Sequence, residues 1–252
     1  MPKIVRVLFG DINADGRFEK CRKTVENDIE YCCHNRFQPE YVSYTFGEDN
    51  HKQLLDLGID SRLVDKKPIA WDLNTQMMRH KLEAFKIGVE EFEEILLLDW
   101  DVLPVKPIPD SFWDTLRNKG EIQAILRKYR YPKCDWRDED KGYIPCAAFV
   151  YINNKNIPDE LLVIWNRLGK IWSEEVVLAK YLDDVSYGWR GIDYYWDNFE
   201  PDFFELVQRN AIVYPSHKRQ SKNKIFHHFH DCGIRKGLKR IHDKQELHEW
   251  EK

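Results

Sequence analysis

The chain has 252 residues, enough for one large domain that buries a core without disulfides or structural metals. Apolar residues make up 42% of the sequence, charged residues make up 33%, and the formal net charge is −4. These values exclude a disordered chain, and the acidic balance argues against a dedicated nucleic-acid binder.

The N-terminal half alternates strand and helix patterns. Lys3–Gly10 has the pattern of a buried strand followed by a polar loop, and apolar residues three and four apart over Phe18–Cys32 predict an amphipathic helix. Tyr41–Phe46 is aromatic and β-branched, which is typical of a second strand. Leu73–Glu91 has helical spacing and leads into the apolar run Ile95–Leu98. This order predicts a mostly parallel central sheet that is flanked by helices.

The second half begins with three prolines in VLPVKPIP, which must take the chain out of the sheet. It then shows weaker patterns of the same kinds. Strands are predicted at Ile122–Leu126, Ala147–Ile152 and Ala211–Val213, and helices at Asp159–Leu168 and Glu174–Leu182. The sequence has no internal repeat and no linker, so we expect a single α/β domain over residues 1–252.

The strongest chemical signal is Asp99-Trp100-Asp101, which directly follows ILLL. Ligands of parallel α/β sheets bind beyond the carboxyl ends of the strands. In an extended chain, residues two apart point to one side, so both carboxylates can bind one hard divalent cation together with phosphate oxygens. The string also resembles haloacid-dehalogenase-like phosphatases, in which the first aspartate is the nucleophile. That family usually has Thr or Val where this chain has Leu103, and its motif follows the first strand.

A second cluster, HHFHDC, places three histidines in four residues from His227 to Cys232. Imidazole binds Mn²⁺ and similar ions beside carboxylates, so one of these histidines is a candidate to complete the site of Asp99 and Asp101. A separate zinc site with Cys232 lacks the usual ligand spacing. Polar surface histidines are the remaining alternative.

Charged residues near two predicted helix starts are further candidates. Arg79 and Lys81 lie off the apolar stripe of the helix before ILLL, where either can reach a bound anion, and a solvated helix face is the alternative. Glu174 and Glu175 follow Ser173, a suitable N-cap, and acids in a first turn suit the helix dipole. One of these two glutamates could instead act as a general base.

Three other features bear on ligands and location. The loop Asp11–Arg22 begins like a calcium loop, but Arg22 stands where a bidentate acid is required, so we expect the loop to border the ligand site instead. Lys218–Arg240 contains eight Lys or Arg and one acid, which indicates an anionic ligand or a membrane surface near this tail, or a solvated basic face. The six cysteines include no CxxC pair, and neither a signal peptide nor a membrane span is evident. We therefore expect free thiols and a cytoplasmic protein without a transmembrane segment.

Taken in order, these motifs resemble the GT-A glycosyltransferases, especially the glycogenin and galactosyltransferase-like group. The segments that carry the resemblance are KIVRVLFGD, EEFEEILLLDWDVLPVKPIP, PCAAFVYINN, the acidic helix start and HHFHDCG. The resemblance implies a GT-A fold, with a nucleotide-sugar lobe over about residues 1–103 and an acceptor lobe with the tail over about 104–252. It implies metal binding by Asp99 and Asp101, with His228, or His230 in its place.

The same resemblance assigns the remaining site residues. Donor-binding residues would be Phe9, Gly10, Asp11, Arg79, Lys81, Trp100, Ala147, Ala148, Arg235 and Lys236. The last two are the less well matched, because the group often has Lys-Pro-Trp after its histidine where this chain has GIRKGL. The implied activity is transfer of a monosaccharide from a nucleotide-diphosphate sugar, with UDP favoured over GDP, to a hydroxyl of a glycan or other acceptor. Mn²⁺ or Mg²⁺ would be the cofactor, and a non-catalytic carbohydrate-binding protein is a further alternative.

Overall fold

The computed structural model of the chain describes residues 2–10, 40–69, 78–100, 102–104, 107–128, 143–168, 174–184, 192–193, 204–206 and 226–228. The strands are β1 (Lys3–Leu8), β2 (Tyr41–Phe46), β3 (Asp60–Asp65), β4 (Ile95–Leu98), β5 (Val102–Pro104), β6 (Ile122–Lys128), β7 (Tyr143–Ile152), β8 (Ile192–Asp193), β9 (Phe204–Leu206) and β10 (Phe226–His228). The helices are α2 (Glu48–Asp56), α3 (Arg79–Phe92), α4 (Asp110–Lys119), α5 (Ile157–Leu168) and α6 (Glu174–Asp184).

The central sheet has seven strands in the order β3-β2-β1-β4-β7-β6-β8. Strands β3, β2, β1 and β4 pair in parallel, and β8 runs parallel to β6. Only β7 is reversed among these seven, because it pairs antiparallel with both β4 and β6. The expected mostly parallel α/β sheet is thereby confirmed. A smaller sheet in the order β5-β10-β9 lies beside it, so the chain does leave the main sheet after β4.

Most predicted elements in the described ranges are present. Tyr41–Phe46 and Ile95–Leu98 are strands with the expected bounds, and the predicted helix over Leu73–Glu91 is present as α3 from Arg79. The predicted helix over Phe18–Cys32 and the strand at Ala211–Val213 lie outside the described residues. Among the described helices, none combines the length and apolar character of a membrane span.

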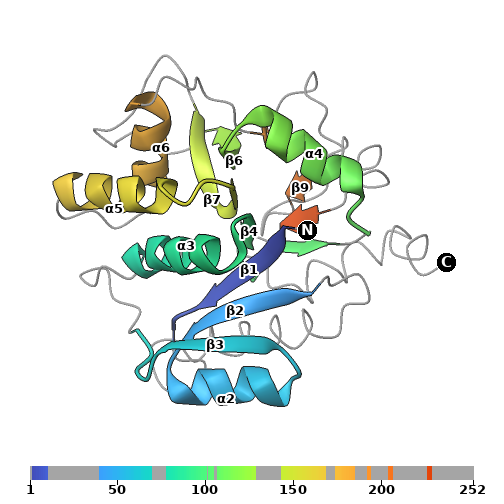
Figure 1. Ribbon diagram of the computed structural model, residues 1–252, viewed down its shortest axis with the longest axis vertical. Coiled ribbons are helices and arrows are strands. Elements are labelled where there is room, and N and C mark those ends of the chain that lie inside the picture. The colour runs from blue at the N-terminus through green and yellow to red at the C-terminus, as the bar shows by residue number, and fades with distance from the viewer. Residues whose placement is uncertain are drawn as a thin grey trace.

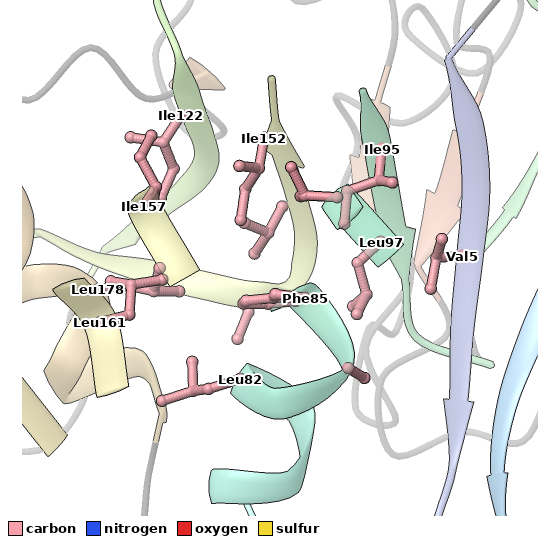
Figure 2. Close-up of a cluster of buried hydrophobic side chains, with 14 of the residues drawn as sticks. Val5, Leu82, Phe85, Ile95, Leu97, Ile122, Ile152, Ile157, Leu161 and Leu178 are labelled. Carbon is pink, nitrogen blue, oxygen red and sulfur yellow. The ribbon is translucent and has the colours of Figure 1, made fainter. Parts of the chain in front are cut away.

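Apolar side chains pack on both faces of the sheet, which explains why the central strand β4 has a continuous apolar sequence. Along β4, Ile95 and Leu97 point to one face and Leu96 and Leu98 to the other. The first face is covered by α3, α5 and α6, which gather on one side of the sheet in Figure 1. Figure 2 shows this cluster, in which side chains of the helices meet those of the strands. The second face packs against Leu54 of α2 and three side chains of α4.

Strand β7 carries an irregularity where it passes the end of β4. Ala124 pairs with Val150, but Ile125 pairs with Cys146, so β7 has extra residues between these two pairs. Ala148 and Phe149, neighbours in sequence, both contribute to the same core cluster, which breaks the usual alternation of a strand. The reversed strand therefore brings Ala147 and Ala148 to the carboxyl end of β4.

Helix α3 lies close against the sheet at Gly88. A Cβ atom at this position would lie 3.2 Å from Cδ1 of Ile95 and 3.4 Å from Cε2 of Tyr44. Gly88 and Lys81 are seven residues apart, close to two helical turns, so they lie on the same side of α3. Both are buried.

Candidate functional site

Asp99 stands at the carboxyl end of β4, near the middle of the central sheet. Its backbone N–H donates to the carbonyl oxygen of Ala148 at 3.0 Å. Its own carbonyl oxygen accepts from the N–H of Val102 at 3.0 Å, so the chain turns between these two residues. We call Asp99–Val102 the β4 turn. Asp101, the second carboxylate of the sequence motif, lies outside the described residues.

A buried lysine connects the β4 turn to α6. Nζ of Lys81 lies 2.6 Å from Oδ1 of Asp99 and 3.1 Å from Oε1 of Glu174. The side chains of Lys81 and Glu174 are only 5% and 7% exposed, whereas that of Asp99 is 39% exposed. The structure thus brings together three predicted site residues from α3, β4 and α6. We call them the Asp–Lys–Glu triad.

The triad fixes the charge of its lysine. Burial by itself lowers the pKa of an ammonium group, but the carboxylates of Asp99 and Glu174 outweigh this and raise the pKa of Lys81 above its ordinary value. Lys81 is therefore a cation throughout the physiological pH range. It can hold carboxylates or attract phosphate oxygens, but it cannot accept a proton there.

Glu175 and two alanines of β7 lie next to the triad. Oε1 of Glu175 accepts a hydrogen bond from the backbone N–H of Ala147 at 3.3 Å. This N–H lies in the irregular part of β7, where pairing with β6 is interrupted. Ala147 and Ala148 are both buried, on opposite faces of the strand. Their small side chains allow α6 and the β4 turn to approach the strand closely.

The other face of the β4 turn rests on an arginine of β1. Nη1 of Arg6 donates to the carbonyl oxygen of Asp99, and Nη2 donates to that of Val102 at 3.0 Å. The guanidinium carbon lies 5.1 Å from the ring centre of Tyr41 and 5.2 Å from that of Trp100. Trp100 is itself fixed, because its Nε1 donates to the carbonyl oxygen of Val7 at 3.1 Å. The ring of Trp100 therefore packs on the sheet beside Arg6.

The predicted loop residues Phe9 and Gly10 are held by their carbonyl groups. The carbonyl oxygen of Phe9 accepts from the N–H of Ile69 at 2.6 Å. The carbonyl oxygen of Gly10 accepts from Nδ2 of Asn50 at 2.7 Å, and the same Nδ2 donates to Phe46 at 2.7 Å. Asn50 is buried in the first turn of α2. It therefore fixes where the chain leaves β1 for the segment that begins with Asp11, which lies outside the described residues.

Strand β10 brings the backbone of His227 and His228 next to β5, which begins at Val102. It pairs antiparallel with β5, and the register places the backbone of His228 opposite Val102, the residue after Asp101. Of the remaining predicted residues, Arg79 forms an ion pair with Glu83 of its own helix. The residues His230, Arg235 and Lys236 lie outside the described part of the chain. Among the described residues, no three His, Cys, Asp or Glu side chains gather as a metal site, and the predicted metal set stays a prediction.

Sequence reasoning missed Arg6 and Asn50. Arg6 lies inside an apolar strand pattern, and its partners are 93 and 96 residues away in the sequence. The one available signal was a charged residue in the middle of KIVRVLFG, where a buried charge requires a partner. Asn50 gave no signal of its own, because asparagine is common in the first turn of a helix.

Solved structures of other proteins share this architecture. No protein-family model matches the sequence, and no curated protein matches it either. Among solved structures, the galactosyltransferase LgtC with donor and acceptor sugar analogs aligns over 98% of this chain and 95% of its own, at 14% identity and a TM-score of 0.54.

Two other glycosyltransferases align in the same way. One is involved in glycosylation of the major capsid of PBCV-1, and it aligns over 96% of this chain and 100% of its own, with 16% identity and a TM-score of 0.51. The bifunctional WbbM aligns over 99% of this chain and 51% of its own, with 10% identity and a TM-score of 0.52. At these identities the likeness concerns the fold, and the chain therefore has the GT-A fold that these glycosyltransferases share.

Proposed function

We propose that the protein is a metal-dependent glycosyltransferase that moves a monosaccharide from a nucleotide-diphosphate sugar to a hydroxyl group of a glycan or other acceptor. UDP is the favoured nucleotide and GDP the second choice. The observation that carries the proposal is the Asp–Lys–Glu triad at the carboxyl end of β4, within a fold whose aligned examples are glycosyltransferases. This is the edge of a parallel sheet at which ligands bind.

The residues at the β4 turn suit a hard divalent cation. The Asp99 carboxylate is partly exposed, and Lys81 contacts its Oδ1, which leaves Oδ2 as a ligand atom. Asp99, Asp101 and the His228 imidazole would hold the cation, and this mixture of carboxylate oxygens and imidazole suits Mn²⁺. When bound, Mn²⁺ or Mg²⁺ would supply Lewis-acid stabilisation of the negative charge that develops on the leaving diphosphate.

The remaining side chains would position the reactants. Lys81 keeps the Asp99 carboxylate oriented and joins it to the start of α6. Because Glu174 is buried against Lys81, the more exposed Glu175 is the better candidate for a base, which an inverting reaction needs and a retaining one does not. Arg235 and Lys236 would add positive charge near the donor diphosphate, and the basic tail could contact a membrane surface.

The position of the motif favours this function over a phosphatase. A dehalogenase-type phosphatase would carry its nucleophile after the first strand of the sheet. Here the described strands β1 to β3 already precede β4 in the same sheet, and Asp99 directly follows β4. A non-catalytic carbohydrate-binding protein would have no need for a buried cation that holds a carboxylate at this edge.

Nucleotide binding is the first test of the proposal. We expect Mn²⁺ and UDP together to raise the thermal unfolding temperature, since a ligand at a hundredfold excess over its Kd stabilises the native state by about 2.7 kcal/mol. UDP without metal should give little shift. The absence of a shift with UDP, GDP, CDP and ADP in the presence of Mn²⁺ would contradict the proposal, and release of phosphate from phosphoesters would then be measured.

Asn50→Ala tests the contribution of the loop after β1. The variant loses the donor to the carbonyl oxygens of Gly10 and Phe46, so we expect the free energy of unfolding to fall by about 1–3 kcal/mol. Binding of UDP with Mn²⁺ should weaken as well, because Gly10 is no longer fixed. Urea unfolding and calorimetric titration measure the two effects. Asn153→Ala, which removes a 3.2 Å hydrogen bond to the Tyr151 hydroxyl, is the control and should leave nucleotide binding unchanged. Equal UDP affinity in wild type and Asn50→Ala would remove Gly10 from the proposed site.

A further inference from the structure

We infer that Arg6 is a positioning residue that holds the β4 turn in the shape required to bind the metal–diphosphate group. This inference rests on the proposed function for its purpose. Its structural part, that Arg6 fixes the turn, stands on the contacts of Arg6 alone.

The contacts of Arg6 are directed at the two ends of the turn. Its two terminal nitrogens donate to the carbonyl oxygens of Asp99 and Val102, so one planar group joins the first and last residues. The hydrogen bond from the Val102 N–H to the Asp99 carbonyl closes the same turn. The two ends of the turn are thereby fixed by hydrogen bonds from the same side chain.

Burial of the Arg6 charge is energetically unfavourable. The Arg6 side chain is fully buried, between Ile4 and Leu8 of the same strand face. Among the described residues it contacts no carboxylate, and its Nε has no hydrogen-bond partner. Its charge is compensated by carbonyl oxygens and by the rings of Tyr41 and Trp100. An apolar side chain would fill such a site more cheaply, so the geometry indicates a role in holding the turn rather than in stabilising the core.

Arg6 and Lys81 contact different atoms of Asp99. Arg6 binds the main-chain oxygen from β1 on one face of the sheet, and Lys81 binds the side-chain Oδ1 from α3 on the other. Both cations are buried, so neither is free to move to a different partner without local unfolding. The carboxylate is consequently fixed in position before a ligand arrives. Groups that orient the ligands of a metal typically affect its affinity by about 10–100-fold.

The test compares Arg6→Met with Val5→Ala. The methionine variant removes both hydrogen bonds and keeps an apolar side chain of similar length. Val5→Ala is the control, because Val5 is fully buried on the opposite face of the same strand and points toward α3. Two quantities are measured for each folded variant: hydrogen exchange of the Asp99 and Val102 amides, and the Kd for UDP in the presence of Mn²⁺.

We expect Arg6→Met to speed exchange of the Val102 amide and to weaken binding of UDP with Mn²⁺ by about tenfold or more, whereas Val5→Ala leaves both close to wild type. Unchanged exchange in a folded Arg6→Met protein would overturn the inference. Faster exchange with unchanged affinity would overturn its functional part. If wild type itself does not bind UDP with Mn²⁺, the proposed function fails while the exchange data still decide whether Arg6 holds the turn. If the methionine variant does not fold, Arg6→Lys, which keeps the buried cation but cannot reproduce the planar fork, serves in its place.

Discussion

Replacement of Asp101 by alanine is expected to reduce sugar transfer by at least about a hundredfold while the protein remains folded. The variant removes the second carboxylate of the sequence motif, which directly precedes Val102 in the sequence, and the backbone of His228 pairs with Val102. With only Asp99 and His228 left, the cation would be held too weakly to stabilise the leaving diphosphate. Transfer from a UDP-sugar in the presence of Mn²⁺ measures the effect, and circular dichroism checks the fold.

The control for this variant is Asp110→Ala. Asp110 is an acid at the start of α4 and is exposed, so its removal changes the net charge equally without touching the β4 turn. Chelation of the metal should abolish transfer by wild type, and added Mn²⁺ should restore it. Near-normal transfer by folded Asp101→Ala would show that the metal assignment is wrong.

Lys81→Met should lower the free energy of unfolding by about 3–5 kcal/mol, which is the usual cost of leaving one partner of a buried ion pair without the other. Glu174 is 7% exposed, and the variant deprives it of the ammonium group 3.1 Å away. Transfer should fall as well, because Asp99 loses the contact that orients its carboxylate. Urea unfolding and the transfer rate provide the two measurements.

A second variant separates stability from activity. Lys81→Met combined with Glu174→Gln removes both charges, so stability should return toward wild type, whereas transfer should stay low. Lys86→Met is the control on the same helix, since Lys86 forms an exposed pair with Asp159 and should matter little. Recovery of full transfer by the double variant would contradict the positioning role of Lys81.

The dependence on pH gives this prediction a further check. A pKa raised by folding means that the stabilisation from Lys81 is complete below the ordinary lysine value of 10.5 and is lost as pH rises above it. The stability difference between wild type and Lys81→Met should therefore be constant near neutral pH and shrink above 10.5. A difference that does not shrink above pH 10.5 would assign the effect to another group.

The parts of the fold that follow from local patterns could be predicted from the sequence. Ile95–Leu98 is apolar throughout because both of its faces are covered, and α3 has helical spacing because one of its sides packs on the sheet. The reversal of β7 could not be predicted in this way. Parallel and antiparallel neighbours both present apolar side chains to the core, so PCAAFVYINN gives no information on strand direction.

The candidate site likewise contains residues that a local sequence pattern indicates and residues that no local pattern indicates. Asp99 was evident from its place after ILLL, since the carboxyl end of a buried strand is a ligand-binding position. The apolar pattern of α3 excludes Lys81, because lysine counts as polar, yet its side chain is buried and pairs with two carboxylates from other elements. Contacts such as those of Arg6 join residues more than ninety positions apart, and no local pattern reports them.

The close approach of α3 at Gly88 has a consequence for the lysine at the other end of that helix. Two helical turns, or about 10 Å, separate Gly88 from Lys81, and over this length a helix behaves as a stiff rod. A Cβ atom at position 88 would lie 3.2 Å from Cδ1 of Ile95, so Ile95 or the helix that carries Lys81 would have to move by a few tenths of an ångström to accept it. The absence of a side chain at Gly88 therefore lets α3 pack closely on the sheet along the same side from which Lys81 reaches Asp99.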